Sequence, residues 1–418
     1  MKAPVVAVVG SFDTKGAELR YLADAVRRHG ARPLLLDCGV LGTPTVEVDV
    51  TADAIAERAG TSLGELRAAN DRGAAVGALG RAVAGLLGEL HDRGEVHGLV
   101  AAGGSNNATL FALAAEGLPF GAPKLLVSTV AAGDTRPYVN AADVGLLYPI
   151  VDIEGLNAVS RDVLRRAGAA IAAMAREASA AVEDDRNADV VAATMFGVTT
   201  PCVSAARELL EAGGDEVLVF HATGVGGQSF ERLIDTGRVA AALDITTTEL
   251  ADEVVGGTLS AGPSRLEAAG RAGIPQVVST GALDMANFGP MSTVPPALRD
   301  RRLYAHNENV TLMRIEPDES REIGRVLSEK VNRASGPVAV LLPLGGVSAL
   351  DSPGAAFEYP ESDAALFDAI RSGVDPSVEL IESELHVNDP GFAELAVATL
   401  ARLRATSTAS TANRHEET

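Results

Sequence analysis

The stretch VVAVVGSFDTKGAELRYLADAVRRHGARPLLLD (residues 5–37) decides the fold class. It contains an apolar run, a turn with two glycines, a segment with apolar residues at helical spacing, and a second apolar run. Short apolar strands that alternate with longer helices are typical of a parallel sheet covered by helices. The stretch therefore predicts a strand–helix–strand unit, with strands at 5–9 and 33–37 and a helix at 17–28.

The same alternation continues along the chain and divides it into two series. In the first series we expect further strands at 98–101 and 124–127, and helices at 71–92, 107–115 and 156–182. In the second we expect strands at 190–193, 216–220, 242–245, 276–279, 338–342 and 378–381, and helices at 204–212, 230–236, 265–271, 318–332, 364–371 and 392–404. The sequence thus predicts an α/β protein with two Rossmann-like domains, mainly parallel sheets covered by helices, and a ligand cleft between the domains.

Changes in composition set the expected domain boundaries. The hydrophilic stretch EDDRNA (residues 183–188) predicts a linker between an N-terminal domain at 1–183 and a C-terminal domain at 189–404. Residues 405–418 are small, polar and unpatterned, which predicts a disordered tail.

Charge and hydropathy narrow the class of partner. The net charge of −21 over 418 residues opposes binding to nucleic acid or to anionic membranes. The apolar run at 5–9 is too short for a signal sequence, and no run of about 18 apolar residues occurs, so we expect a cytoplasmic protein. Cys38 and Cys202 form no CxxC pair, which gives no support to a metal cluster or a redox dithiol.

Four predicted strands end in turns rich in glycine or hydroxyl side chains, at 10–16, 103–107, 221–227 and 244–249. Such turns let backbone N–H groups approach an anion, and the helix that follows adds partial positive charge. No GxxxxGK[ST] string occurs, and no GxGxxG with a downstream acid, so ordinary P-loop and dinucleotide sites are disfavoured. Plain tight connections are the alternative. The residues predicted to bind an anionic cofactor are Ser11, Asp13, Thr14, Lys15, Gly103, Gly104, Ser105, Asn106, Thr223, Gly224, Gly226, Gly227, Thr246 and Thr247.

A few other side chains are candidates for chemistry. Arg136 could anchor a carboxylate or phosphate, or could close a local turn with Asp134. Asp244 and Glu249 flank three threonines and could hold a hydrated Mg²⁺ ion. The candidates for general acid or base are His221 and His306, for which a hydrogen-bonded structural role is the alternative. No GxSxG string supports a serine hydrolase.

Several strings resemble one known family. GSFDTKGAE, PKLLVSTVAAGDTRPYV, VFHATGVGGQSFE, LDITTTELAD and HVNDPGF look like the Tm-one-like ATP-binding family, whose bacterial members are uncharacterised and similar to the N-terminal domain of the tomato tobamovirus-resistance protein. The similarity extends from about residue 5 to residue 403. It implies two Rossmann-like domains, a homodimer, and binding of ATP with magnesium. Family members often continue the first glycine pair as GGSGGT, whereas this chain has Asn106, Asn107 and Ala108 after Ser105. This departure argues against ATP as the ligand more strongly than it argues against an anionic ligand in general.

Three functions remain open from the sequence. The favoured hypothesis is a protein that binds a nucleotide, ATP with Mg²⁺, as its small anionic ligand. The second is a metabolic enzyme, of lyase or hydrolase type, that acts on a small carboxylate or phosphorylated acid with His221 or His306 as acid or base. The third is a protein-interaction module without a ligand.

Overall fold

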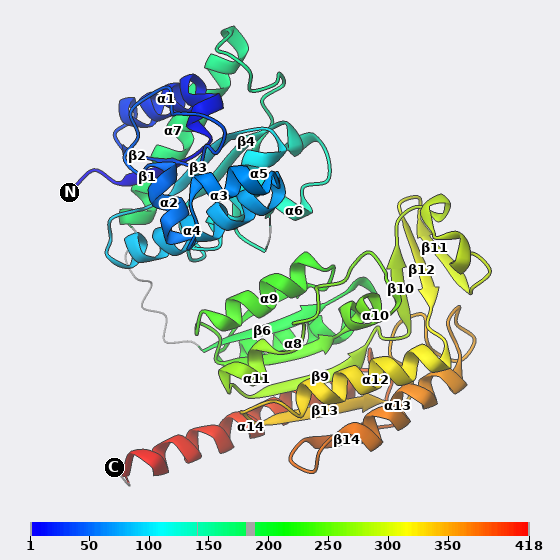
Figure 1. The fold of residues 1–418 in the computed structure, drawn as a ribbon. Helices are drawn as coiled ribbons and strands as arrows, with labels where there is room; N and C mark the ends of the chain where they lie inside the picture. The colour runs from blue at the N-terminus through cyan, green and yellow to red at the C-terminus, as the bar shows by residue number, and fades with distance from the viewer. Residues whose placement is uncertain (1, 140, 181–188, 417–418) are drawn as a thin grey trace. The chain divides into compact units, whose positions relative to one another are not determined.

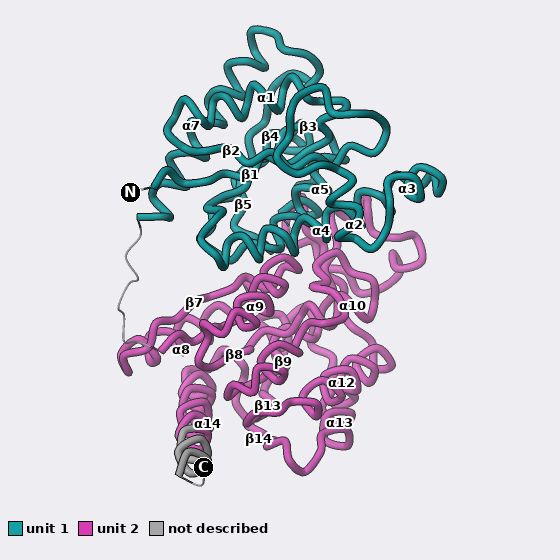
Figure 2. The backbone as a smooth tube through the Cα atoms, turned by 60° about the vertical axis from the view of Figure 1, so that its left-hand side comes forward, with its two compact units in different colours: residues 1–185 teal, residues 186–418 magenta. Residues whose placement is uncertain are grey.

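The computed structural model describes residues 2–139, 141–180 and 189–416 (Figure 1). The chain forms two compact units, Met1–Asp185 and Arg186–Thr418 (Figure 2), and each is an α/β unit built on a parallel sheet. The predicted fold class of two helix-covered, mainly parallel sheets is therefore confirmed. The linker predicted at 183–188 lies outside the described residues.

Unit 1, residues 1–185, contains a five-stranded sheet in the order β2-β1-β3-β4-β5, with every neighbouring pair parallel. Alternate residues of β1 point to opposite faces, as the two-residue period of a strand requires. Val6 and Val8 pack against α1 and α7, whereas Ala7 and Val9 pack in the cluster that includes α2, α4 and α5. The strands are β1 (Val5–Gly10), β2 (Arg32–Asp37), β3 (Leu99–Gly103), β4 (Lys124–Ser128) and β5 (Val144–Leu147).

The helices of unit 1 cover both faces of this sheet (Figure 1). They are α1 (Phe12–Arg28), α2 (Ala52–Arg58), α3 (Leu63–Ala69), α4 (Arg72–Asp92), α5 (Ser105–Ala115), α6 (Arg136–Val139) and α7 (Ala158–Ala180), with a 3-10 turn η1 (Thr129–Ala132). By length and composition α4 could cross a membrane. Its residues Leu79, Val83 and Leu87 are buried in the core of the unit.

Unit 2, residues 186–418, contains a six-stranded parallel sheet in the order β14-β13-β9-β8-β6-β7. One face packs against α8 and α14, and the other packs against α9 to α13. The strands are β6 (Val190–Met195), β7 (Glu216–His221), β8 (Ala241–Thr246), β9 (Gln276–Gly281), β13 (Val338–Pro343) and β14 (Glu379–Ser383). The helices are α8 (Thr200–Ala212), α9 (Val225–Asp235), α10 (Thr248–Val255), α11 (Ala268–Ala272), α12 (Pro317–Val331), α13 (Pro360–Gly373) and α14 (Pro390–Glu416).

Unit 2 also differs from the expectation in two places. A three-stranded antiparallel sheet, in the order β10-β12-β11, is formed by Met285–Phe288, Val310–Arg314 and Leu303–Asn307. These strands are only four or five residues long and lack regular alternation, so the sequence pattern did not predict them. The helix α14 continues to Glu416 where the sequence predicted a disordered tail from Ala405. No glycine or proline interrupts the chain between these residues, so nothing in the sequence forces the helix to end.

Candidate functional site

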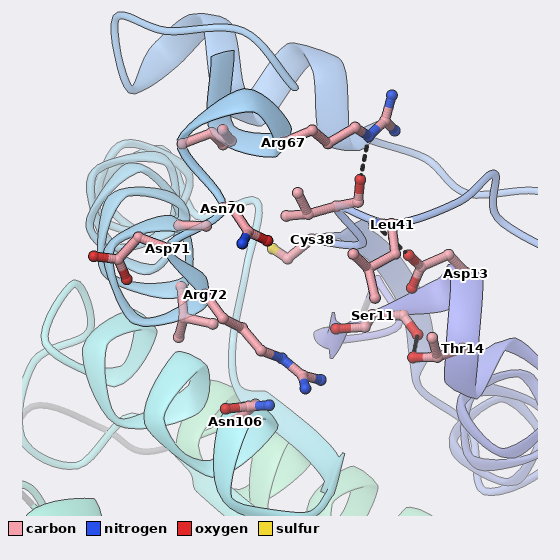
Figure 3. A pocket seen from close by; sticks show the side chains of 14 residues that line it. Ser11, Asp13, Thr14, Cys38, Leu41, Arg67, Asn70, Asp71, Arg72 and Asn106 are labelled. Atoms are coloured by element: carbon pink, nitrogen blue, oxygen red, sulfur yellow. Dashed lines mark hydrogen bonds between the residues drawn. The ribbon is translucent and has the colours of Figure 1, made fainter. Parts of the chain in front are cut away.

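The order of strands in unit 1 places a candidate site at one edge of its sheet. Strand order reverses at β1, whose neighbours are β2 and β3, and in open α/β sheets ligands bind outside the carboxyl ends of the strands at such a switch point. A cavity of about 260 Å³ lies there (Figure 3), with walls that include residues following β1, β2 and β3 and residues from the start of α4. Two of the four predicted turns, at 10–16 and 103–107, thus contribute to one pocket.

Two helices, α1 and α5, begin at this pocket, and neither is capped by the side chain of its own N-cap residue. Ser11 is the N-cap of α1 and Gly104 is the N-cap of α5, and neither makes a side-chain capping hydrogen bond. Instead, Ser11 Oγ donates to Asn107 Oδ1 at 3.1 Å, and Asn107 Nδ2 donates to the carbonyl oxygen of Ala102 at 3.0 Å. The two turns are therefore joined to each other. Asp37 already accepts from the first N–H group of α1, so the N-terminus of α5 is the more open of the two to an anion.

The two aspartates near the pocket hold the loop after β2 in place. Asp13 Oδ2 accepts hydrogen bonds from the N–H groups of Leu41 and Gly42, at 3.0 and 2.9 Å. Asp37 Oδ1 accepts from the N–H groups of Phe12 and Gly39, at 3.0 and 2.8 Å, and burial raises the pKa of this carboxyl. Asp13, which was predicted to bind the cofactor, therefore shapes the rim of the pocket.

Two arginines that the sequence did not predict, Arg67 and Arg72, line this pocket, and Arg72 is the one whose side chain enters the site. Its side chain extends from the start of α4 toward Asn106 and Ser11 (Figure 3). The Asn106 oxygen accepts from Arg72 Nε at 2.8 Å and from Nη2 at 2.9 Å, with the amide in the orientation that these donors require. Within the described part of the chain, no carboxylate forms an ion pair with Arg72. The sequence did contain a signal for the position of Arg72. Asp71 is an N-cap residue, which makes Arg72 the first residue of α4.

The other basic residues near the predicted turns are engaged elsewhere. Lys15 forms an ion pair with Glu154, and Thr14 Oγ1 donates to the Ser11 carbonyl oxygen. Arg67, on the pocket wall, donates through Nε to the carbonyl oxygen of Val40 (Figure 3). Arg136 pairs with Asp134 at 2.7 Å and lowers the pKa of that carboxyl to about 2, which matches the alternative of a local turn.

In unit 2 the third and fourth predicted turns meet each other. The N–H groups of Gly224 and Gly227 both donate to Glu249 Oε1, at 2.7 and 3.0 Å. A Cβ atom at Gly227 would lie 2.1 Å from Glu249 Oε2, so the close approach requires glycine. A carboxylate of the chain itself thus occupies the N–H groups that the sequence predicted would bind phosphate.

The carboxylates predicted to bind magnesium contact a buried arginine instead. Arg265 is fully buried, and its guanidinium contacts Asp244 at 2.5 and 2.7 Å, Glu249 at 2.6 Å and Glu231 at 3.2 Å. Across the residues that the structure describes, no group of three or more His, Cys, Asp or Glu side chains is placed to hold a metal ion. The sequence analysis missed Arg265 because a lone arginine in a predicted helix suggests a solvated side chain.

The remaining predicted residues of unit 2 are either buried or solvent-facing. Thr246 Oγ1 donates to the Thr194 carbonyl oxygen and Thr247 Oγ1 to that of Ser279, and both threonines are fully buried. His221 is exposed, with its ring centroid 5.5 Å from that of Phe196, and His306 is exposed on β11. Neither ring has a hydrogen-bond partner among the described residues, so no neighbouring group orients either one as an acid or base.

Buried carboxyl groups in unit 2 predict a pH-dependent stability. Burial raises the pKa of Asp252 to about 7, from an ordinary value of 3.8. Between these two pH values the folded state holds a proton that the unfolded state releases, so the free energy of unfolding falls as pH rises from about 4 to about 7. We expect Asp252→Asn to make the free energy of unfolding less dependent on pH in this range, by up to about 1.4 kcal/mol per pH unit. Urea denaturation of both proteins at several pH values measures it, and equal slopes would contradict the assignment.

The comparisons with known proteins agree with the two units. Residues 4–180 match the N-terminal domain of an uncharacterised protein family, UPF0261, and residues 188–404 match its C-terminal domain. A UPF0261 protein of Clostridium tetani is 42% identical over 389 residues, which is 93% of this chain and 96% of that protein. A UPF0261 protein of Rhizobium meliloti is 46% identical over 393 residues, 94% of this chain and 97% of the relative.

A plant relative is longer than this chain. The ToMV resistance protein Tm-1 of Solanum lycopersicum is 39% identical over 415 residues, which is 94% of this chain but 55% of the tomato protein. A solved UDP-N-acetylglucosamine 2-epimerase from Rickettsia bellii aligns with 66% of this chain and 79% of its own, at 12% identity and a TM-score of 0.21, which is too low to support an argument. From the domain matches and the bacterial relatives, the chain belongs to the UPF0261 family.

Proposed function

We propose that unit 1 binds a phosphorylated small molecule of the nucleotide class in the pocket at the carboxyl ends of β1 and β3. The observation that carries this proposal is Arg72, a guanidinium without a carboxylate partner in the described structure, in the same pocket as the N-termini of α1 and α5. Helix N-termini favour negative charge, and arginine binds phosphate through paired N–H groups. The proposal includes two expectations from the sequence: the protein is cytoplasmic, and it is a homodimer.

The apolar side chains that line the pocket support a ligand with an apolar part. Val40, Leu41, Leu66 and Val76 line the same cavity as Arg72 and Asn106. Small-molecule sites typically combine an apolar lining with a few polar groups that fix orientation. A base or a similar flat group on these side chains would leave the phosphate beside Ser11 and Arg72.

Arg72→Gln tests this assignment directly. The substitution keeps a hydrogen-bonding side chain but removes the charge, and hydrogen bonds to charged groups contribute about 1.5–3 kcal/mol. We expect AMP, used as the probe, to bind roughly 10- to 100-fold more weakly in isothermal titration calorimetry. Arg58→Gln is the matched control, because Arg58 lies in the same unit but pairs with Glu89 at 2.5 Å outside the pocket. Equal affinity of the Arg72 variant and the wild type would refute the proposal.

Gly104→Val tests the contribution of the α5 N-terminus. A Cβ atom at Gly104 would have no atom within 4 Å, so a side chain can begin there without overlap, and we expect it to stand at the helix N-terminus. We expect the far-UV circular dichroism spectrum to stay unchanged while the thermal shift produced by AMP is lost. A retained thermal shift would remove this turn from the binding site.

A further inference from the structure

The pocket of unit 1 has a definite capacity for charge and size, and we infer from it that the ligand carries a single phosphate group and binds without magnesium. This inference rests on the proposed function, since it concerns the same pocket. It differs from the resemblance to an ATP-binding family, which implies a triphosphate with its metal ion.

The pocket holds little positive charge, which suits one phosphate better than three. Arg72 and the N-terminus of α5 supply positive charge, whereas the N-terminus of α1 already binds Asp37. Arg67 also lines the pocket and keeps its charge, since it donates to a neutral carbonyl oxygen, but Asp13 and Asp71 line the same pocket and offset part of the total. A phosphomonoester, with about −1.5 to −2 charges at pH 7, needs less positive charge than a triphosphate. A triphosphate would leave excess negative charge in a chain whose net charge is already −21.

The carboxylates of the pocket do not fit a magnesium ion. Mg²⁺ is usually held by one or two carboxylates together with substrate phosphates. Asp13 Oδ2 already accepts two N–H groups, and its Oδ1 atom is buried against Gly39. Asp71 accepts from the N–H group of Ala74 as the N-cap of α4. Binding a metal through Asp13 Oδ2 or Asp71 Oδ1 would remove the hydrogen bonds that shape the rim loop or begin the helix.

The size of the cavity gives the same result independently. Its volume of about 260 Å³ lies below the roughly 300–1,000 Å³ of pockets that enclose drug-sized ligands. Apolar side chains line some of this volume, so only the remaining volume beside Arg72 suits charged groups of a ligand. One phosphate on a body no larger than a nucleoside fits these limits better than an extended chain of three phosphates.

Isothermal titration calorimetry of the full chain at fixed ionic strength tests the inference with four probes: inorganic phosphate, AMP, ATP, and ATP with magnesium. We expect AMP to bind at least tenfold more tightly than ATP, phosphate to compete with AMP, and magnesium to leave the ATP affinity no higher. We also expect Arg72→Gln to lose AMP and phosphate together, while Arg58→Gln keeps both.

The outcomes separate this inference from the proposed function. If ATP binds as tightly as AMP or tighter, or if magnesium strengthens ATP binding, and Arg72→Gln abolishes that binding, the single-phosphate inference is overturned while the anion site stands. If no probe binds, or if all probes bind the Arg72 variant as well as the wild type, the proposed function fails and the inference fails with it.

Discussion

Arg265→Met is expected to lower the free energy of unfolding by about 3–5 kcal/mol, because it removes a guanidinium that pairs with three buried carboxylates. Asp244 and Glu249 are nearly or fully buried, and Glu231 is largely buried. Methionine fills a similar volume but offers no donor, so the variant must either bury unpaired negative charge or take up protons. Burial already raises the pKa of Glu231 and Glu249, and the loss of Arg265 would raise both values further.

Differential scanning calorimetry and urea denaturation measure this effect. Arg271→Met is the matched control in the same unit, because Arg271 pairs with Asp235 at 2.9 Å and both side chains are about half exposed. Exposed pairs contribute about 0–1 kcal/mol, so the control should remain close to the wild type. A loss of similar size in both variants would show that the buried ion pairs of Arg265 contribute no more to stability than an exposed ion pair. Should the Arg265 variant fail to accumulate as folded protein, Glu249→Gln gives a milder test, with an expected loss smaller than that of Arg265→Met.

Gly226→Ala is expected to lower the free energy of unfolding of unit 2 by about 3 kcal/mol or more. Overpacking typically costs roughly 1–3 kcal/mol, and the overlap here is severe. A Cβ atom at Gly226 would lie 1.7 Å from the carbonyl oxygen of His221 and 2.7 Å from its carbonyl carbon. Both atoms belong to the backbone at the end of β7, so no side-chain rotation can relieve the overlap. Either the start of α9 or the end of the strand must move.

The control for this variant is Gly197→Ala, which lies in the same unit at the start of a 3-10 turn. A Cβ atom there would have no atom within 4 Å, so we expect a change in melting temperature near zero. If Gly226→Ala melts like Gly197→Ala, the close contact between the glycine turn and β7 does not exist in solution. The comparison also decides whether this glycine serves packing, as the structure indicates, or a ligand.

The fold could be predicted from the sequence because its signals are local. Each strand of the two parallel sheets except the short β5 follows from an apolar run, and most of the helices from apolar residues three and four positions apart. The half-buried β5 carries too weak a pattern, and the sheet of β10, β11 and β12 pairs segments that have no strong pattern of their own. For the same local reason, the turns after β1 and β3 could be identified as candidates for anion binding.

The sequence by itself determined the two parallel sheets, their covering helices and the glycine-containing turns at the strand ends. Only the tertiary structure decided which turns remain open to a ligand. It brings Arg72 from the start of α4 to the turns after β1 and β3, and it brings Glu249 and Arg265 to the turn after β7. The physical reason is that a backbone N–H group can donate to a phosphate or to a carboxylate, so the three-dimensional positions of distant charged side chains determine which anion it meets.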